Sequence, residues 1–415
     1  MYEILTLPNG VRIAYEHLPG VRSAAVGIWV GVGSRCERRG EEGSAHFIEH
    51  MLFKGTRFSD AQCLARRMDA IGGQVNAFTT RDSTCFYARV LDEHLPEASS
   101  ILTEMFFDSL FDEEDVKSER CVVLDEIDMY NDTPEDQVVE RLLARCFPGP
   151  LGKPVLGSAR SLEKMTGESL RSFMGREYTP DRIVVSLCGS FTDKDAGFLA
   201  ERFSAMTPSV SQPWKTSAYA PSVYFRRKAT EQNHLCLGWP GLPELDEKRY
   251  AWRLLSNILG GGMSSRLFQT IREQHSLCYS INSFTASYAD AGMLGVETAV
   301  SPESEETAIR LILEEIEKLC RDGVTEEELR CAGSMAKSSI ILSAESTSSR
   351  MNRLGASVLQ EGRCLSTDEL VALYEKVTSD DITELARKTL TRDVSFSAVG
   401  RLRDKEKYLT DLHLM

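Results

Sequence analysis

Two histidines and one glutamate of this sequence have the spacing of a metal site. His46 and His50 are four residues apart, so on a helix they lie on one face, one turn apart. Glu49 lies three residues after His46 on nearly the same face, where it can reach a water molecule without being a ligand. Neutral imidazoles combined with a carboxylate suit zinc. We therefore expect His46 and His50 to bind one metal ion beside Glu49.

A catalytic zinc usually has three protein ligands and one open position, so a third side chain is needed. Glu119 and Glu126 are seven residues apart in a predicted helix, two turns along one face. One of them can ligate while the other supports from outside, and spacing alone leaves open which does which. A histidine pair alone is more often two ordinary helix residues. The complete order His-x-x-Glu-His is the inverted zincin signature and is far more specific.

Alternating strands and helices are predicted to position these residues. We expect four strands and six helices in the first half. The predicted strands span 24–31, 74–80, 83–91 and 182–189, and the predicted helices span 44–54, 59–71, 94–109, 112–131, 134–146 and 191–205.

The two halves of the sequence resemble each other. At an offset of 206 residues, 75–79 (VNAFT) aligns with 281–285 (INSFT), and at an offset of 213 residues, 113–117 (EEDVK) aligns with 326–330 (EEELR). A Pro/Ser-rich stretch over 207–222 separates the halves. We predict a duplicated α+β unit, with a metal-binding domain at 1–206, a linker at 207–222 and a homologous domain at 223–415.

Only the first half carries the histidines and glutamates of the predicted metal site. At the same offsets, His46, Glu49 and His50 align with Trp252, Leu255 and Ser256, and the two glutamates align with Ala332 and Ser339. A purely structural role does not explain why one copy alone has these groups.

Composition excludes several classes of protein. The 415 residues carry a formal net charge of −14, which argues against a nucleic-acid partner. No run of about 18 apolar residues is present, so no membrane span is expected. The eleven cysteines are scattered without a CxxC pair, which favours free thiols in a reducing compartment. With no evident secretory signal, the predicted location is a bacterial-type cytoplasm, with the mitochondrial matrix as the alternative.

The histidine and glutamate motifs resemble those of the pitrilysin/insulinase family of inverted-motif zinc peptidases. The resemblance is strongest to half-length members akin to mitochondrial processing peptidase subunits. The motif at 46–50 (HFIEH) is similar to the family's active-site helix, and 119–126 (ERCVVLDE) is similar to its second zinc segment. The resemblance implies that Glu126 is the third ligand and Glu119 the supporting acid. It also implies one Zn²⁺ per chain and two homologous α+β domains, each a mostly antiparallel sheet with helices packed on it.

The resemblance extends to residues that contact substrate. The segment 72–79 (GGQVNAFT) is similar to the edge strand that receives substrate backbone, here Asn76, Ala77, Phe78 and Thr79. In the second half, Arg272 and Tyr279 look like the family's Arg–Tyr pair. We therefore expect an endopeptidase in which Glu49 activates water and Tyr279 stabilises an oxyanion.

Half-length relatives pair in a clamshell-like dimer around an unfolded peptide, which implies a homodimer here or else a heterodimer. The alternatives are a peptide-binding or structural subunit of a processing-peptidase-like complex and, more remotely, a metal hydrolase of small molecules.

Overall fold

The computed structural model describes residues 2–390 and 393–412, which form two compact units. Unit 1 contains the described residues up to 127 together with 153–215 and 340–367. Unit 2 contains 128–152, 216–339 and the described residues after 367. Each unit has one sheet covered by helices on both faces, as expected for the predicted α+β architecture.

The sheet of unit 1 has six strands in the order β1-β2-β6-β3-β5-β4. Only the β2–β6 pair is parallel, and the other pairs are antiparallel. The strands are β1 (Tyr2–Thr6), β2 (Arg12–His17), β3 (Ser23–Val30), β4 (Gln74–Thr79), β5 (Thr84–Leu91) and β6 (Ile183–Gly189).

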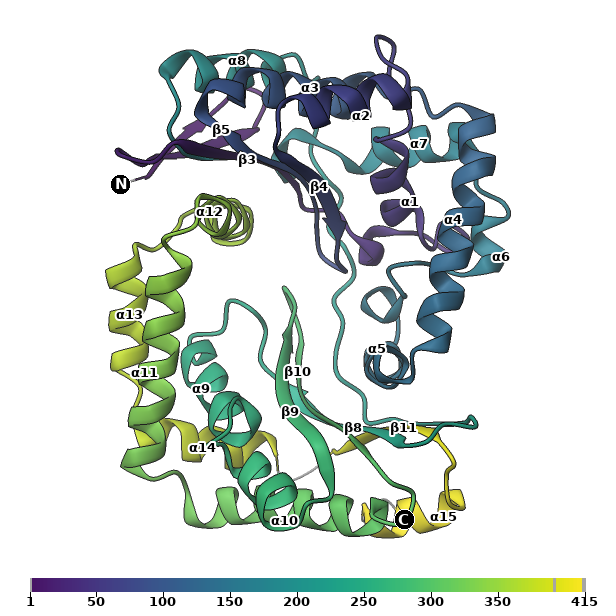
Figure 1. Ribbon diagram of the computed structural model, residues 1–415, viewed down its shortest axis with the longest axis vertical. Coiled ribbons are helices and arrows are strands. Elements are labelled where there is room, and N and C mark those ends of the chain that lie inside the picture. Colours follow the sequence, from purple (N-terminus) through teal and green to yellow (C-terminus); the bar gives the residue numbers. More distant parts are fainter. Residues whose placement is uncertain (1, 391–392, 413–415) are drawn as a thin grey trace. The chain divides into compact units, whose positions relative to one another are not determined.

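Side chains of the central strand β3 alternate between the two faces of this sheet. Val26 and Ile28 enter the core on the face covered by α3 and α8, whereas Ala25 and Trp29 contact α12 on the opposite face. Figure 1 shows α3 and α8 on one side of the strands and α12 on the other. The helices that lie wholly or mostly in unit 1 are α1 (Ser44–Met51), α2 (Ala61–Ala70), α3 (Leu95–Asp108), α4 (Glu113–Asp132), α6 (Ala159–Leu162), α7 (Gly167–Glu177), α8 (Asp193–Ser204) and α12 (Thr347–Glu361).

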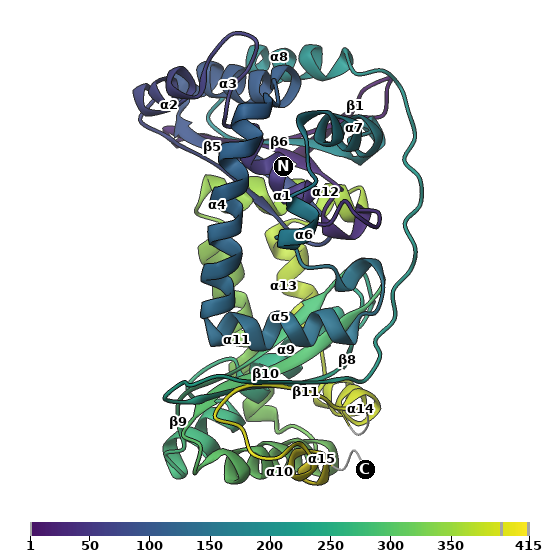
Figure 2. The ribbon, with the colours of Figure 1, turned by 90° about the vertical axis from the view of Figure 1, so that its right-hand side faces the viewer.

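The sheet of unit 2 has five strands in the order β7-β11-β8-β10-β9, again with one parallel pair, β7–β11. One face is covered by α5, whose Val138 and Leu142 enter an apolar cluster with sheet residues such as Cys236 and Met293. Figure 2 shows α5 on one side of this sheet and α10 and α14 on the other. The strands are β7 (Val223–Arg227), β8 (Asn233–Gly241), β9 (Cys278–Ser287), β10 (Gly292–Val300) and β11 (Ser395–Gly400).

The remaining helices complete unit 2. A π-helix over Phe268–Gln274 precedes β9. The helices that lie wholly or mostly in unit 2 are α5 (Pro134–Cys146), α9 (Arg249–Gly260), α10 (Glu305–Asp322), α11 (Glu326–Ser343), α13 (Thr367–Glu375), α14 (Ser379–Thr389) and α15 (Lys405–Asp411).

The predicted duplication is confirmed by the topology. Without β1, the first sheet reads β2-β6-β3-β5-β4, and β7-β11-β8-β10-β9 repeats this pattern of connections. Helices α1 and α4 correspond in order to α9 and α11. Every strand and helix predicted in the first half is present, with ends displaced by at most three residues.

The compact units exchange two helices relative to the predicted domain borders. Residues 207–222 carry no helix or strand, in keeping with the linker hypothesis. However, α5 of the first half belongs to unit 2 and α12 of the second half belongs to unit 1. Each of these helices buries its apolar face on the sheet of the unit to which it belongs, and that sheet is formed by the other half of the sequence. Contacts and the sequence repeat therefore divide the chain differently.

Two further properties concern the described residues only. None of their helices is both long enough and apolar enough to cross a membrane. All eleven cysteines lie among them, and all are free thiols.

Candidate metal centre

Helix α1 is short, and its apolar side chains fix which way its polar ones point. Ala45, Phe47, Ile48 and Met51 are buried in the core of unit 1. This anchors one side of the helix, so that His46 and His50 lie together toward α4, with their rings 4.6 Å apart. The predicted placement of the two imidazoles on one helix face is therefore confirmed.

Buried apolar residues of helix α4 likewise determine that Glu119 and Glu126 lie on one face of that helix. Val116 and Val123 are buried in the core of unit 1, and Glu119 and Glu126 each follow one of these valines by three residues. This spacing repeats every seven residues, close to two helical turns. Packing of the valines therefore turns both carboxylates toward α1, with Glu119 buried and Glu126 partly exposed.

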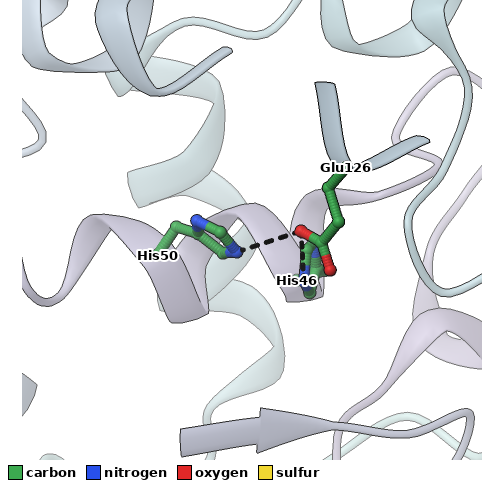
Figure 3. A group of neighbouring side chains, drawn as sticks. All are labelled: His46, His50 and Glu126. Carbon is green, nitrogen blue, oxygen red and sulfur yellow. Dashed lines mark ion pairs between the residues drawn. The ribbon is translucent and has the colours of Figure 1, made fainter. Parts of the chain in front are cut away.

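Three side chains that could hold a metal ion converge between these helices (Figure 3). The Nε2 atoms of His46 and His50 lie 3.7 and 3.6 Å from Oε2 of Glu126. One ligand atom from each residue falls within 4.8 Å of the others. Ligands about 2.0–2.2 Å from a tetrahedral zinc are separated from one another by about 3.3–3.6 Å, so the group fits this ion with little movement. Sequence spacing left Glu119 and Glu126 interchangeable, whereas the structure brings Glu126 to both imidazoles.

Glu119 contacts the ring nitrogen of His50 that faces away from Glu126. Its Oε1 lies 2.7 Å from Nδ1 of His50, and its other oxygen forms an ion pair with Lys54. With Nδ1 donating to Glu119, the lone pair of His50 is on Nε2, which faces Glu126. Burial raises the pKa of Glu119, but the hydrogen bonds from His50 and Lys54 outweigh this and lower it. Glu119 is therefore suited to orient a ligand.

The two imidazoles differ in their surroundings. Burial, followed by the neighbouring charge of His50, lowers the pKa of His46 to about 3, so its ring is neutral and able to ligate. Burial also lowers the pKa of His50, but the hydrogen bond and charge of Glu119 more than compensate and raise it. Among the described residues, buried Nδ1 of His46 has no hydrogen-bond partner. His46 is thus oriented by its backbone and packing rather than by a second carboxylate.

Glu49 is held by the end of strand β4. The hydroxyl of Thr79 donates to Oε2 of Glu49 at 2.6 Å, and also lies 3.3 Å from the hydroxyl of Thr84. Burial raises the pKa of Glu49, opposed by the hydrogen bond from Thr79 and the charge of His50. A carboxylate with a raised pKa is a better proton acceptor near neutral pH. The sequence predicted only a main-chain role for Thr79, and no local spacing indicates this contact.

Strand β4 is at the edge of the first sheet, because it pairs only with β5. The predicted edge position of Asn76–Thr79 is therefore confirmed. The N–H of Ala77 donates to the side-chain oxygen of Asn76 at 2.8 Å. The free side of such a strand offers main-chain groups to an extended peptide.

Arg272 and Tyr279 lie in unit 2, near the start of β9. The guanidinium of Arg272 lies 4.5 Å from the ring centre of Phe268 and 5.2 Å from that of Tyr279. Tyr279 is 82% exposed. The structure therefore brings the predicted pair together and leaves the phenol accessible.

Known sequences and structures resemble the whole chain. A family profile described as "Insulinase (Peptidase family M16)" matches residues 12–159, and one described as "Peptidase M16 inactive domain" matches residues 164–332. The uncharacterized zinc protease YmxG of Bacillus subtilis is 41% identical over 96% of this chain and 98% of its own length. The uncharacterized zinc protease SCO5738 of Streptomyces coelicolor is 39% identical over 97% of this chain and 90% of its own.

Solved structures show the same fold. A peptidase M16 inactive domain from Pseudomonas fluorescens superposes with a TM-score of 0.90 at 19% identity, covering 97% of this chain and 98% of that one. A protease from Helicobacter pylori superposes with a TM-score of 0.88 at 20% identity, covering 96% and 99% of the two chains.

Proposed function

The chain belongs to the insulinase family of peptidases, peptidase family M16, and we propose that it is a zinc-dependent endopeptidase acting on extended peptides. The observation that carries the proposal is the convergence of His46, His50 and Glu126, with Glu49 beside them. These three residues would hold one Zn²⁺, and Glu119 would orient His50. Relatives named zinc proteases support the same metal.

Glu49 would act as general base and then as general acid. A zinc ion, when bound, supplies a Lewis acid that polarises a carbonyl group and lowers the pKa of a water molecule. Glu49 takes the proton of the attacking water and delivers it to the amine that leaves, which restores its carboxylate. Thr79 donates to Oε2 of Glu49, so the other oxygen of that carboxylate is left for the proton.

Substrate backbone would add to strand β4 along Asn76–Thr79. Main-chain pairing requires an extended segment and is largely independent of side chains, so unfolded peptides of varied sequence would bind and folded domains would not. Since Thr79 both ends the strand and holds Glu49, a peptide aligned on β4 is placed next to the base.

Arg272 and Tyr279 would complete the site from a second chain. We propose a dimer, with a homodimer preferred over a heterodimer, that encloses the peptide in a chamber. Tyr279 would donate to the developing oxyanion, and Arg272 would hold a substrate carbonyl. The exposed phenol of Tyr279 and its stacking with Arg272 support this role.

Mixing two variants tests the role of the second chain. Glu49→Gln and Tyr279→Phe should each have low activity, and a mixed dimer should recover part of it, because one of its two sites has both groups intact. No recovery after demonstrated subunit exchange would show that Arg272 and Tyr279 do not act across a dimer.

Turnover distinguishes an enzyme from a peptide-binding or structural subunit. A quenched fluorescent peptide should be cleaved by the zinc-loaded chain, and a chelator should abolish cleavage until zinc is restored. Binding of the peptide without cleavage, with one zinc per chain verified, would favour the binding subunit and overturn the proposed enzyme.

A further inference from the structure

Helix α1, which carries His46 and His50, has no side-chain cap from its own N-cap residue. Its N-cap residue is Gly43, which has no side chain to accept a hydrogen bond from the first turn. Glycine is required there, because φ is +94° and an added Cβ would lie 2.9 Å from the main-chain oxygen of Leu156. The first N–H groups of a helix have no partner within it, so they must find one elsewhere.

Glu37 supplies that partner from outside the helix. Its Oε2 accepts from the N–H of Gly43 at 2.9 Å, and its Oε1 accepts from the N–H of Ala45 at 3.0 Å. The Glu37 side chain is buried, with the residue only 3% exposed. Burying a carboxylate is costly unless it is hydrogen bonded, and a helix N-terminus favours a negative charge. Burial raises the pKa of Glu37, and the hydrogen bonds from the N–H groups of Ala45 and Gly43 and the charge of Lys153 oppose this rise. Lys153 lies close and binds the main-chain oxygen of Glu37.

The loop that carries Glu37 also forms hydrogen bonds with the residues that directly follow strand β4. The N–H of Ser34 donates to the main-chain oxygen of Thr80 at 3.3 Å, and the N–H of Arg35 donates to that of Arg81 at 3.1 Å. At Gly33, an added Cβ would lie 2.2 Å from the oxygen of Thr80. One loop therefore joins the end of β4 to the start of α1.

His46 is the ligand that depends on this loop. It is the third residue of α1, directly after Ala45, and it has no carboxylate like the one that Glu119 provides for His50. The helix has only eight residues, which is too short to be stable by its own propensity. If its first turn frayed, His46 would move while His50 stayed held.

We propose that Glu37 is a positioning residue that presets His46 for zinc by capping α1, an inference that rests on the proposed zinc site. A cap that forms independently of the metal would lower the ordering that binding otherwise requires. Glu37 itself touches neither metal nor substrate. Its role is therefore measured as zinc affinity rather than as chemistry.

The test compares Glu37→Gln with a control cap on another helix. In Glu37→Gln an amide nitrogen replaces one oxygen and faces an N–H donor, so one of the two bonds is lost. The control is Asp60→Ala, which removes the side-chain cap of α2, where Asp60 accepts from the N–H of Cys63 at 2.7 Å. Both variants should lower the melting temperature of the metal-free protein.

Zinc affinity, measured by competition with a chelating dye, separates the two variants. Glu37→Gln should bind zinc about 10–100-fold more weakly than wild type, as for loss of an outer partner of a metal site. Asp60→Ala should bind zinc as wild type does. Wild-type affinity in Glu37→Gln, or an equal loss in Asp60→Ala, would overturn the role of Glu37. Absence of zinc binding by the wild-type chain would instead overturn the metal site.

Hydrogen exchange tests the cap even if Glu37→Gln does not fold. In metal-free wild-type protein the amides of Gly43 and Ala45 should exchange slowly, because Glu37 accepts from both. Rapid exchange at these two amides, slowed only when zinc is added, would show that the metal and not Glu37 orders the first turn.

Discussion

Helices α1 and α4 of unit 1 and helices α9 and α11 of the second half are two versions of one arrangement. Where α1 has His46 and Glu49, α9 has Trp252 and Leu255, which are almost fully buried. Where α4 has Glu119, α11 has buried Ala332. In α9 and α11 these positions carry no histidine and no acidic group, and Ser256, which corresponds to His50, is buried and hydrogen bonded to Ser283. Buried polar groups cost stability, so their presence in the first version indicates chemistry rather than architecture.

The largest effects are expected when the proposed zinc ligands are removed. His46→Ala, His50→Ala and Glu126→Ala should each lose bound zinc and peptidase activity, because two protein ligands hold the ion poorly. Glu119→Ala should keep the site but weaken zinc binding by about 10–100-fold. Metal content after gel filtration measures both, and full zinc occupancy in Glu126→Ala would contradict the assignment.

Loss of the base should affect turnover without affecting the metal. Glu49→Gln should retain zinc and lose activity by about 100- to 10,000-fold, because an amide does not accept the proton of water. Peptide cleavage and zinc content are measured on the same sample. Undiminished turnover in the zinc-loaded variant would rule out Glu49 as the base.

A smaller effect is expected at Thr79, the last residue of β4, which donates a hydrogen bond to the proposed base Glu49. Thr79→Val keeps the shape of the side chain but removes the hydrogen bond to Glu49, and should reduce kcat by about 10-fold, which corresponds to about 1.4 kcal/mol. Thr79→Ser is the matched control and should retain most activity, because its hydroxyl still donates. Equal activities of the valine and serine variants would show that the hydrogen bond does not matter for catalysis.

The smallest effect is expected in α9 and α11, at the positions that correspond to the proposed zinc site. Ser339 on α11 corresponds to Glu126, is exposed and has no acidic group. Ser339→Ala should therefore leave zinc content, activity and melting temperature unchanged within error. Loss of zinc in this variant would mean that the two versions are less different than their sequences indicate.

Local patterns predicted much of this molecule, and contacts between distant segments could not be predicted. Periodicity predicted α1 and α4 and put His46 and His50 on one face, because that spacing is a property of a single helix. It did not predict which glutamate meets the imidazoles, because this depends on how α4 packs through Val116 and Val123.

The same reason explains what the sequence did not reveal. Thr79 is 30 residues from Glu49 in sequence, and neither residue type indicates that they meet. The sequence predicted α5 as a helix but did not indicate which sheet its apolar face covers. Resemblance to a family supplied the Arg272–Tyr279 pair, which no spacing indicated.

The central claim is that unit 1 alone holds the metal, at His46, His50 and Glu126. The most direct test is an anomalous difference map from crystals of the zinc-loaded chain, collected on both sides of the zinc absorption edge. The account predicts one peak per chain, about 2.0–2.2 Å from Nε2 of both histidines and from a carboxylate oxygen of Glu126. No peak at these atoms in zinc-loaded crystals, or a peak of equal height between α9 and α11, would contradict it.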